Sequence, residues 1–426
     1  MITAKAFADK HYAVLGLARS GLATVEALLA SGARVTAWDD KAEARAKTPT
    51  GVALEDLVDS DLTQFDAIIV TPGLPLNRHP IALRAQQAGV EIIGDIELFA
   101  RARPQLPPHK VVGITGTNGK STTTALVHHI LKTAGVPTTM GGNIGLPILS
   151  QEPLPEGGVY VLELSSYQID LTKSLDCDVA VLLNVTPDHL DRYESFEAYA
   201  ASKARLFEMQ SPKRTAIVDY RAEADEDVLD FAEDPFIQFI DDVDPGDQTE
   251  WPALQGPHNR QNAAAAVATC RDLGVDDALI QHGLRTYPGL PHRMERVREK
   301  DGVLFVNDSK ATNAEAAAPA LAAYPRIRWI VGGQAKAETL GDTAKHLDHV
   351  AKAYTIGKAG PMFARLFREA GVEVDECETL ENAVNRAAAD SQSSETVLLS
   401  PASASFDQFR DFEARGDRFR ELVEGL

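Results

Sequence analysis

Residues 110–121 read KVVGITGTNGKS, an apolar run that leads into a turn rich in glycine. Residues 122–133 follow with a helical pattern, so this part of the chain predicts a strand, a turn and a helix. Glycines let backbone N–H groups approach phosphate oxygens, and a helix N-terminus favours negative charge. The Lys120 ammonium group can reach the outer phosphates of a nucleotide, and the Ser121 hydroxyl group can ligate Mg²⁺. The turn therefore predicts a nucleotide site formed by Gly116, Thr117, Asn118, Gly119, Lys120, Ser121 and Thr122.

This loop is a variant of the usual pattern, because Ile114 stands where a glycine is expected five residues before Gly119. An ordinary glycine-rich turn between a strand and a helix is the alternative.

Short apolar runs alternate with helical patterns on both sides of the loop, which predicts an α/β fold with parallel sheets. Residues 101–110 (RARPQLPPHK) are rich in proline and predict a linker. The length of 426 residues suggests two to four domains, and we expect three. We place them at residues 1–100, 101–289 and 290–426. The strands are predicted in the runs 11–17, 33–40, 66–73, 110–115, 158–166, 178–186, 303–309, 326–333, 353–357 and 396–402.

The composition excludes several classes of protein. A formal net charge of -20 argues against broad nucleic-acid binding, which needs a basic surface. Three widely spaced cysteines give neither a disulfide framework nor metal-ligand spacing, so we expect three buried thiols. The chain has no apolar run of about 18 residues and no signal-peptide pattern at its start. We expect a cytoplasmic monomer without a membrane span.

Two polar side chains follow predicted strands and are candidates for Mg²⁺ ligands: Glu163 in LELSSYQ and His189 in NVTPDHLDRY. Lys203 lies on the apolar face of a predicted helix, in ESFEAYAASKARLFE. Burial there should lower the pKa of its amine, and a neutral amine reacts with CO₂ to give a carbamate. The alternatives are a surface histidine and a lysine that extends its ammonium group to solvent.

The first predicted domain contains a possible dinucleotide site. Residues 16–21 (GLARSG) follow a strand and open a helix, and Asp39 ends the next strand. The middle glycine of the dinucleotide pattern is replaced by Ala18, which weakens the case for NAD. A turn that only starts a helix is a further alternative.

Seven motifs occur in order along the chain: GTNGKST, LELSSYQ, NVTPDHLDRY, GPHNRQN, LPHR, NDSKATN and LSPASASFDQF. Together they resemble the Mur ligases of bacterial cell-wall precursor synthesis. The resemblance implies a Rossmann-like N-terminal domain for a UDP-sugar substrate, a central P-loop ATPase domain and a C-terminal Rossmann-like domain for an amino acid. NDSKATN and LSPASASFDQF favour the addition of D-glutamate to UDP-N-acetylmuramoyl-L-alanine through an acyl phosphate. A sibling ligase, a folylpolyglutamate synthase, a nucleotide-binding regulatory module and an NAD-dependent oxidoreductase are the alternatives.

The resemblance also implies roles for individual residues. Lys120, Glu163, His189 and a carbamylated Lys203 are expected to be catalytic, and Ser121, Glu163, His189 and Lys203 to hold the metal. ATP is expected to contact Asn259, Asn262, Arg293 and Asp308 as well as the loop. The UDP substrate is expected at Gly16, Leu17, Ala18, Arg19, Ser20, Asp39, Asp40, Gly73, Asn143 and His189. D-glutamate is expected at Thr312, Lys336, Ser405, Phe406 and Phe412, although Thr312 and Ser405 are also common helix or turn caps.

Overall fold

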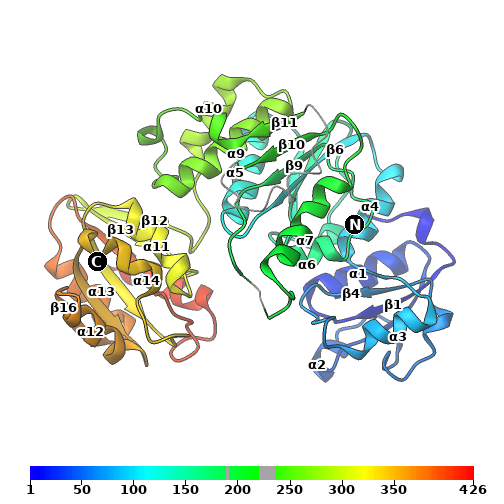
Figure 1. Cartoon of the computed structure of the whole chain (residues 1–426), viewed down its shortest axis with the longest axis horizontal. Coiled ribbons are helices and arrows are strands. Elements are labelled where there is room, and N and C mark those ends of the chain that lie inside the picture. Colours follow the sequence, from blue (N-terminus) through cyan, green and yellow to red (C-terminus); the bar gives the residue numbers. More distant parts are fainter. Residues whose placement is uncertain (189–190, 220–235) are drawn as a thin grey trace. The chain divides into compact units, whose positions relative to one another are not determined.

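The computed structural model describes residues 1–188, 191–219 and 236–426. The chain forms two compact units. Unit 1 comprises Met1–Asp244 and Asn262–Gly283, and unit 2 comprises Pro245–Gln261 and Leu284–Leu426. Figure 1 traces the elements of each unit along the chain.

The first sheet of unit 1 has five parallel strands in the order β3-β2-β1-β4-β5. Its inner strands are short apolar runs buried on both faces, as parallel sheets covered by helices require. The strands are β1 (His11–Leu15), β2 (Arg34–Trp38), β3 (Ala53–Leu54), β4 (Ala67–Val70) and β5 (Ile92–Ile93). The helices are α1 (Arg19–Ala30), α2 (Ala42–Arg45), α3 (Pro80–Ala88) and α4 (Asp95–Ala102).

The second sheet of unit 1 has six parallel strands in the order β11-β10-β9-β6-β8-β7. The predicted phosphate loop follows β6, at the centre of this sheet. The strands are β6 (His109–Thr115), β7 (Thr138–Gly142), β8 (Gly158–Glu163), β9 (Val179–Leu182), β10 (Thr215–Val218) and β11 (Ile237–Phe239). The helices are α5 (Lys120–Thr133), α6 (Ser166–Asp170), α7 (Phe196–Glu208), α9 (Pro257–Asp272) and α10 (Asp277–Thr286), of which α9 and α10 run across the boundaries of the units.

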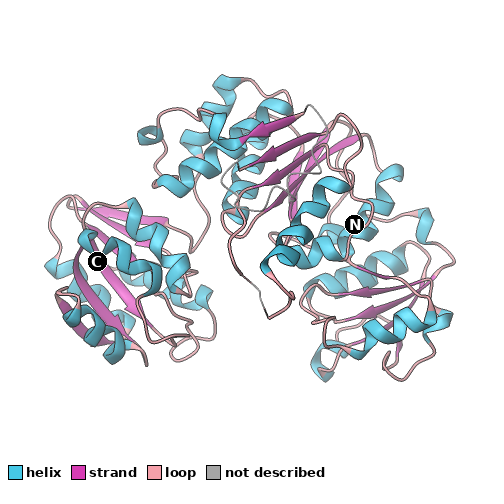
Figure 2. Cartoon of the chain, in the orientation of Figure 1, coloured by secondary structure: helices cyan, strands magenta, loops and turns pink. Residues whose placement is uncertain are grey.

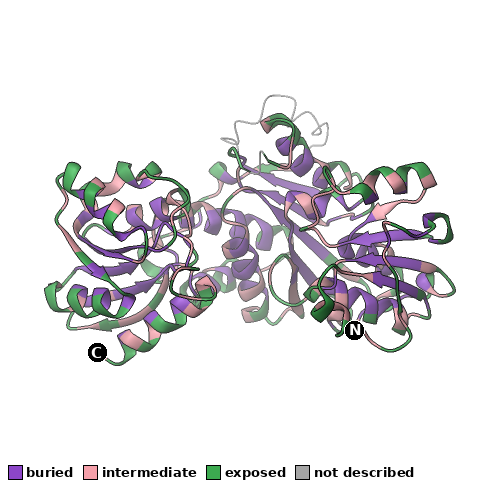
Figure 3. Cartoon of the chain, turned by 90° about the horizontal axis from the view of Figure 1, so that it is seen from below, coloured by how far each residue is buried: buried purple, intermediate pink, exposed green. Residues whose placement is uncertain are grey.

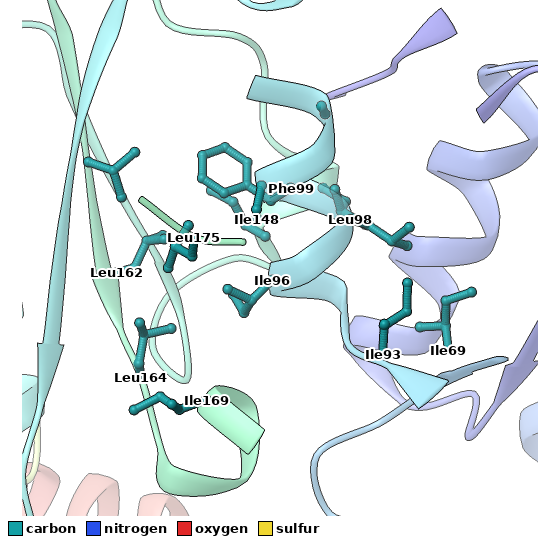
Figure 4. Close-up of a cluster of buried hydrophobic side chains, with 14 of the residues drawn as sticks. Ile69, Ile93, Ile96, Leu98, Phe99, Ile148, Leu162, Leu164, Ile169 and Leu175 are labelled. Atoms are coloured by element: carbon teal, nitrogen blue, oxygen red, sulfur yellow. The ribbon is translucent and has the colours of Figure 1, made fainter. Parts of the chain in front are cut away.

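The two sheets of unit 1 share one hydrophobic core through helix α4. Figure 4 shows Ile96, Leu98 and Phe99 of α4 between side chains of both sheets, such as Ile69 and Leu162. The prediction of a linker at residues 101–110 is therefore wrong. Helix α4 continues to Ala102, a 3-10 turn covers Arg103–Gln105 and β6 begins at His109. The prolines end a packed helix there because they interrupt its hydrogen bonding, and they do not create a free spacer.

Unit 2 contains a third sheet with the order β12-β13-β17-β14-β15-β16, in which only the pair β12 and β13 is antiparallel. Successive residues of β14 contribute to two different hydrophobic clusters, Trp329 to one and Ile330 to the other. Side chains of a strand alternate between faces, so helices cover both faces of the sheet, as Figure 2 shows. The strands are β12 (Glu295–Lys300), β13 (Val303–Asn307), β14 (Ile327–Gly332), β15 (Val350–Ile356), β16 (Val374–Glu378) and β17 (Thr396–Leu399). The helices are α11 (Ala314–Ala323), α12 (Gly360–Glu369), α13 (Leu380–Asp390) and α14 (Phe412–Glu424).

Seven short 3-10 elements complete the described chain: η1 (Lys5–Phe7), η2 (Leu62–Gln64), η3 (Arg103–Gln105), η4 (Ile148–Ser150), η5 (Ile240–Asp242), η6 (Gln248–Glu250) and η7 (Gly341–His349).

The predicted α/β class with mainly parallel sheets is confirmed, and the inner strands of all three sheets are largely buried (Figure 3). The three cysteines are free and buried, as expected. The sequence patterns did not reveal β3, β5, β7, β10, β11, β12 or β16. Within the described parts of the chain, no helix combines the length and the apolar composition needed to cross a membrane.

Candidate functional site

The turn between β6 and α5 has the backbone conformation that its glycines allow. Gly116 and Gly119 have φ angles of +145° and +86°, which favour glycine over residues with a side chain. A Cβ atom on Gly119 would lie 2.3 Å from Oδ1 of Asn262, so the loop also needs glycine for close packing. Asn262 is buried on α9 and accepts a hydrogen bond from Thr123 Oγ1 at 3.3 Å. The structure therefore brings the loop together with one of the two asparagines that sequence analysis assigned to the nucleotide.

Two lysines converge on one carbonyl group of the loop. Lys120 Nζ donates to the carbonyl oxygens of Gly116 and Thr117 at 2.7 Å each. Lys203 Nζ, on α7, donates to the same Gly116 oxygen at 3.1 Å and lies 4.5 Å from the centroid of the Tyr199 ring. Lys203 is 1% exposed, so its ammonium group does not extend to solvent. Burial, and then the charge of Lys120, lower the pKa of Lys203 to about 7.

Asn184, which sequence analysis did not select, fixes the conformation of the loop. Its side chain accepts from the Asn118 backbone N–H at 2.8 Å and donates to the Asn118 carbonyl at 3.1 Å. Its own carbonyl accepts from the Thr117 N–H at 2.9 Å. The available signal was its place directly after an apolar strand, inside the motif NVTPDH. Asn184 therefore holds the backbone that would meet a phosphate.

Glu163 ends β8, next to β6, and its side chain is 2% exposed. Oε1 accepts from Asn143 Nδ2 at 3.0 Å, whereas Oε2 is buried and has no hydrogen-bond partner among the described residues. A buried carboxylate oxygen without a donor is costly unless a cation or another donor meets it. This oxygen, together with the buried Ser121, therefore fits a divalent cation. His189, the third predicted ligand, lies outside the described residues. No group of three His, Cys, Asp or Glu side chains arranged for a metal was found in the residues that are described.

The turn at 16–20 follows β1, and its residues are held by short hydrogen bonds. Asp39 accepts from the backbone N–H of Leu17 at 2.7 Å through one oxygen and from that of Lys41 at 2.9 Å through the other. Arg19 Nη2 donates to the carbonyl oxygen of Gly145 at 3.0 Å. Ala18 precedes the first residue of α1 and Ser20 lies in that helix. The structure thus links the first sheet to the loop that carries Asn143, within unit 1.

Gly16 is required in this turn, because its φ angle is +95° and a Cβ atom there would lie 2.4 Å from Thr71 Oγ1. The carbonyl oxygen of Asp40 accepts from Arg45 Nη1 at 3.0 Å, and that of Gly73 accepts from Arg192 Nη1 at 3.4 Å.

Unit 2 carries the remaining candidates for ATP. Asp308 is buried at the end of β13 and accepts hydrogen bonds from Ser400 Oγ at 2.7 Å and from the Met294 N–H at 3.1 Å. Burial raises the pKa of Asp308 to about 7, although these hydrogen bonds and the nearby Arg293 oppose the shift. Asn259 is buried on α9 and donates to the Gln255 carbonyl at 3.0 Å.

Four of the five candidates for D-glutamate lie on loops of unit 2, and the fifth, Phe412, lies in a helix. Ser405 is buried, Thr312 is half-buried and Lys336 is exposed. Phe412 begins α14, with Lys310 Nζ 4.7 Å from its ring centroid, and Phe406 is 70% exposed. The helix N-caps next to these residues are Asn313 for α11 and Asp411 for α14. Thr312 and Ser405 are therefore not the side chains that cap these helices.

Comparisons with known proteins match each part of the chain to the same family. Residues 10–94 match the model of the Mur ligase MurD-like N-terminal domain. Residues 114–242 match the Mur ligase middle domain, and residues 292–403 match the Mur ligase glutamate ligase domain.

Relatives and solved structures agree with this match. The chain is 59% identical over its full length to the UDP-N-acetylmuramoylalanine–D-glutamate ligase of Novosphingobium aromaticivorans, covering 97% of it. It is 58% identical to the ligase of that name from Sphingopyxis alaskensis, and both chains are fully covered. Among solved structures, MurC and MurF of Thermotoga maritima each share the fold at a TM-score of 0.59 and 18% identity. The alignments cover 98% of this chain and 99% of MurC, and 99% of this chain and 96% of MurF, which was solved in complex with ADP. The chain belongs to the Mur ligase family.

Proposed function

We propose that this enzyme is an ATP-dependent ligase that joins D-glutamate to UDP-N-acetylmuramoyl-L-alanine in peptidoglycan precursor synthesis. The observation that carries the proposal is the full-length identity of 54–59% to relatives named for this reaction. The MurD-like match at residues 10–94 favours a UDP-sugar over NAD as the ligand of the first sheet. The proposal includes a division of the chain into three domains, at residues 1–100, 101–289 and 290–426. The three separate family matches support this division.

The reaction needs two steps because a carboxylate is a poor electrophile and does not react readily with an amine. The alanine carboxylate attacks the γ-phosphorus of ATP, giving an acyl phosphate and ADP. The neutral amine of D-glutamate then attacks the acyl carbon, and the tetrahedral intermediate expels inorganic phosphate to leave the amide. In the first step two anions must meet, so positive charge at the phosphate loop lowers the barrier.

The residues of the loop supply that charge and the geometry. Lys120 exchanges its bonds to the Gly116 and Thr117 carbonyls for phosphate oxygens, while Asn184 keeps the backbone in place. Mg²⁺, when bound, supplies Lewis-acid neutralisation of phosphate charge. Glu163 and Ser121 would hold it, with His189 as a further ligand. The remaining proposed contacts to ATP are Asn259, Asn262, Arg293 and Asp308.

Lys203 is proposed to act as a carbamate. With a pKa of about 7, a large share of its amine is neutral near neutral pH. The ammonium group first loses one proton, and the neutral amine nitrogen then bonds to the carbon of CO₂ and releases a second proton, so that a cationic side chain becomes an anionic carbamate beside the loop. This change removes the repulsion between Lys203 and Lys120 at the Gly116 carbonyl. Lys203→Ala should be inactive and regain activity with added short carboxylates. An inactive variant that no small acid rescues would leave only a structural lysine.

D-glutamate is proposed to bind in unit 2, where Lys336, Thr312 and Ser405 offer a cation and two hydroxyl groups to its carboxylates. Phe406 and Phe412 would contact its carbon chain. The three free thiols and the use of ATP support a cytoplasmic enzyme, and we propose that it acts as a monomer.

One assay tests the proposal against its rivals. Phosphate release is measured with ATP, Mg²⁺ and UDP-N-acetylmuramoyl-L-alanine, and D-glutamate is compared with L-glutamate, meso-diaminopimelate and L-lysine. Release that depends on D-glutamate is expected. Preference for another amino acid would indicate a sibling ligase, and no affinity for ATP with Mg²⁺ would overturn the proposal.

A further inference from the structure

The turn after β7 is bonded directly to the end of β8. Gly142 and Glu163 are partners in the parallel register of these strands, and the Asn143 N–H donates to the Glu163 carbonyl at 2.9 Å. Gly142 has a φ angle of +87°, and a Cβ atom there would lie 2.1 Å from that carbonyl oxygen. Only glycine permits this approach. The backbone bonds therefore fix the position from which the Asn143 side chain extends, beside Glu163.

The Asn143 side chain completes this link. Its Nδ2 donates to Glu163 Oε1 at 3.0 Å, and the amide must be the donor because an ionised carboxylate only accepts. Glu163 is 2% exposed, and its other oxygen is the one that has no donor among the described residues. The hydrogen bond thus decides which carboxylate oxygen stays available.

We infer that Asn143 is a positioning residue for Glu163, which holds Oε1 so that Oε2 is available to a divalent cation. This role is separate from the contact to the UDP substrate that the family resemblance implies for Asn143, and it rests on the proposed function of Glu163 as a metal ligand. Partners that orient metal ligands typically contribute roughly 10- to 100-fold to metal affinity. Asn143 would therefore belong to the cation site in addition to its expected contact with the UDP substrate.

Binding of Mn²⁺, used as the probe, tests this role without turnover. Electron paramagnetic resonance titrations are made with saturating ADP and without the UDP substrate, on the wild-type chain, Asn143→Ala and Arg19→Ala. Asn143→Ala should raise the Kd for Mn²⁺ by roughly 10- to 100-fold. Arg19→Ala is the matched control, because Arg19 holds the same loop at Gly145 and makes no hydrogen bond or ion pair to Glu163 in the described part of the chain. It should weaken binding of the UDP substrate and leave the Kd for Mn²⁺ within about twofold.

A double-mutant cycle separates positioning from a general disturbance of the loop. In a Glu163→Gln background, adding Asn143→Ala should leave the Mn²⁺ affinity unchanged, because the residue acts through Glu163. Independent, multiplying losses would overturn the inference, as would an unchanged Kd in the single variant Asn143→Ala. If the wild-type chain with ADP bound no Mn²⁺, both the proposed metal site and this role of Asn143 would be refuted. If Asn143→Ala bound Mn²⁺ as tightly as the wild-type chain does, only the role of Asn143 would be refuted.

Discussion

Replacement of Lys203 by methionine tests whether a buried amine is held near the phosphate loop. Lys203 is 1% exposed, and burial followed by the charge of Lys120 lowers its pKa from 10.5 to about 7. A lowered pKa in the folded state means that the unfolded chain binds the proton more tightly between these two pH values. The stability contributed by Lys203 is therefore complete above about pH 10.5 and is lost as the pH falls through about 7.

The size of the effect follows from the linkage of proton binding to folding. Between about pH 7 and pH 10.5, each rise of one pH unit adds about 1.4 kcal/mol to the free energy of unfolding of the wild-type chain. The total gain is limited to on the order of 5 kcal/mol. Between about pH 7.5 and pH 9.5 the wild-type chain should gain roughly 2–3 kcal/mol relative to Lys203→Met. For a folding unit of this size, that gain corresponds to a shift in Tm of roughly 4–12 °C.

Thermal melts of both chains in CO₂-free buffers across this pH range provide the measurement. The absence of CO₂ ensures that the free amine is titrated and not a carbamate. Lys5→Met, which removes an exposed lysine of the same unit, is the control and should show no comparable trend. A difference in Tm between wild type and Lys203→Met that stays constant with pH would refute the argument, since it would mean that Lys203 keeps its proton in the folded chain.

Three further predictions concern the loop, the link to Glu163 and unit 2. Lys120→Ala should retain the fold but lower kcat for phosphate release by on the order of 10³-fold, because the cation that offsets the approach of two anions is lost; an activity within about tenfold of wild type would contradict this. Gly142→Ala should lower the free energy of unfolding by about 1–3 kcal/mol, because its Cβ would meet the Glu163 carbonyl at 2.1 Å. Gly135→Ala, with a φ of +78° and nothing within 4 Å, should cost less, and equal melting temperatures for the two variants would show that the close approach is not what matters. Asp308 has its pKa raised by burial to about 7, so its contribution to stability is present below about pH 4 and is lost as the pH rises through 7. Relative to Asp308→Asn, the wild-type chain should therefore lose up to ~4 kcal/mol over this range, measured by thermal melts; a pH-independent difference would rule out a neutral carboxyl group at Asp308.

Local patterns in the sequence predict most of the fold and the centre of the site. The order of strand, glycine turn and helix around Lys120 depends on residues that are close together in the chain. The burial of Lys203 follows from the three- and four-residue spacing of the apolar side chains on its own helix. The order of seven motifs predicts the family.

Contacts between distant parts of the chain needed the tertiary structure. Asn184 meets Asn118 because β9 lies beside β6, and Asn143 meets Glu163 because β7 and β8 are paired in one register. The bond from Arg19 to Gly145 joins residues 126 positions apart. A proline-rich segment looked like a linker because the shared core around α4 leaves no local trace. Sequence periodicity reports which face of an element is apolar, but the packing of elements decides which polar groups meet, and the buried oxygen of Glu163 is a consequence of that packing.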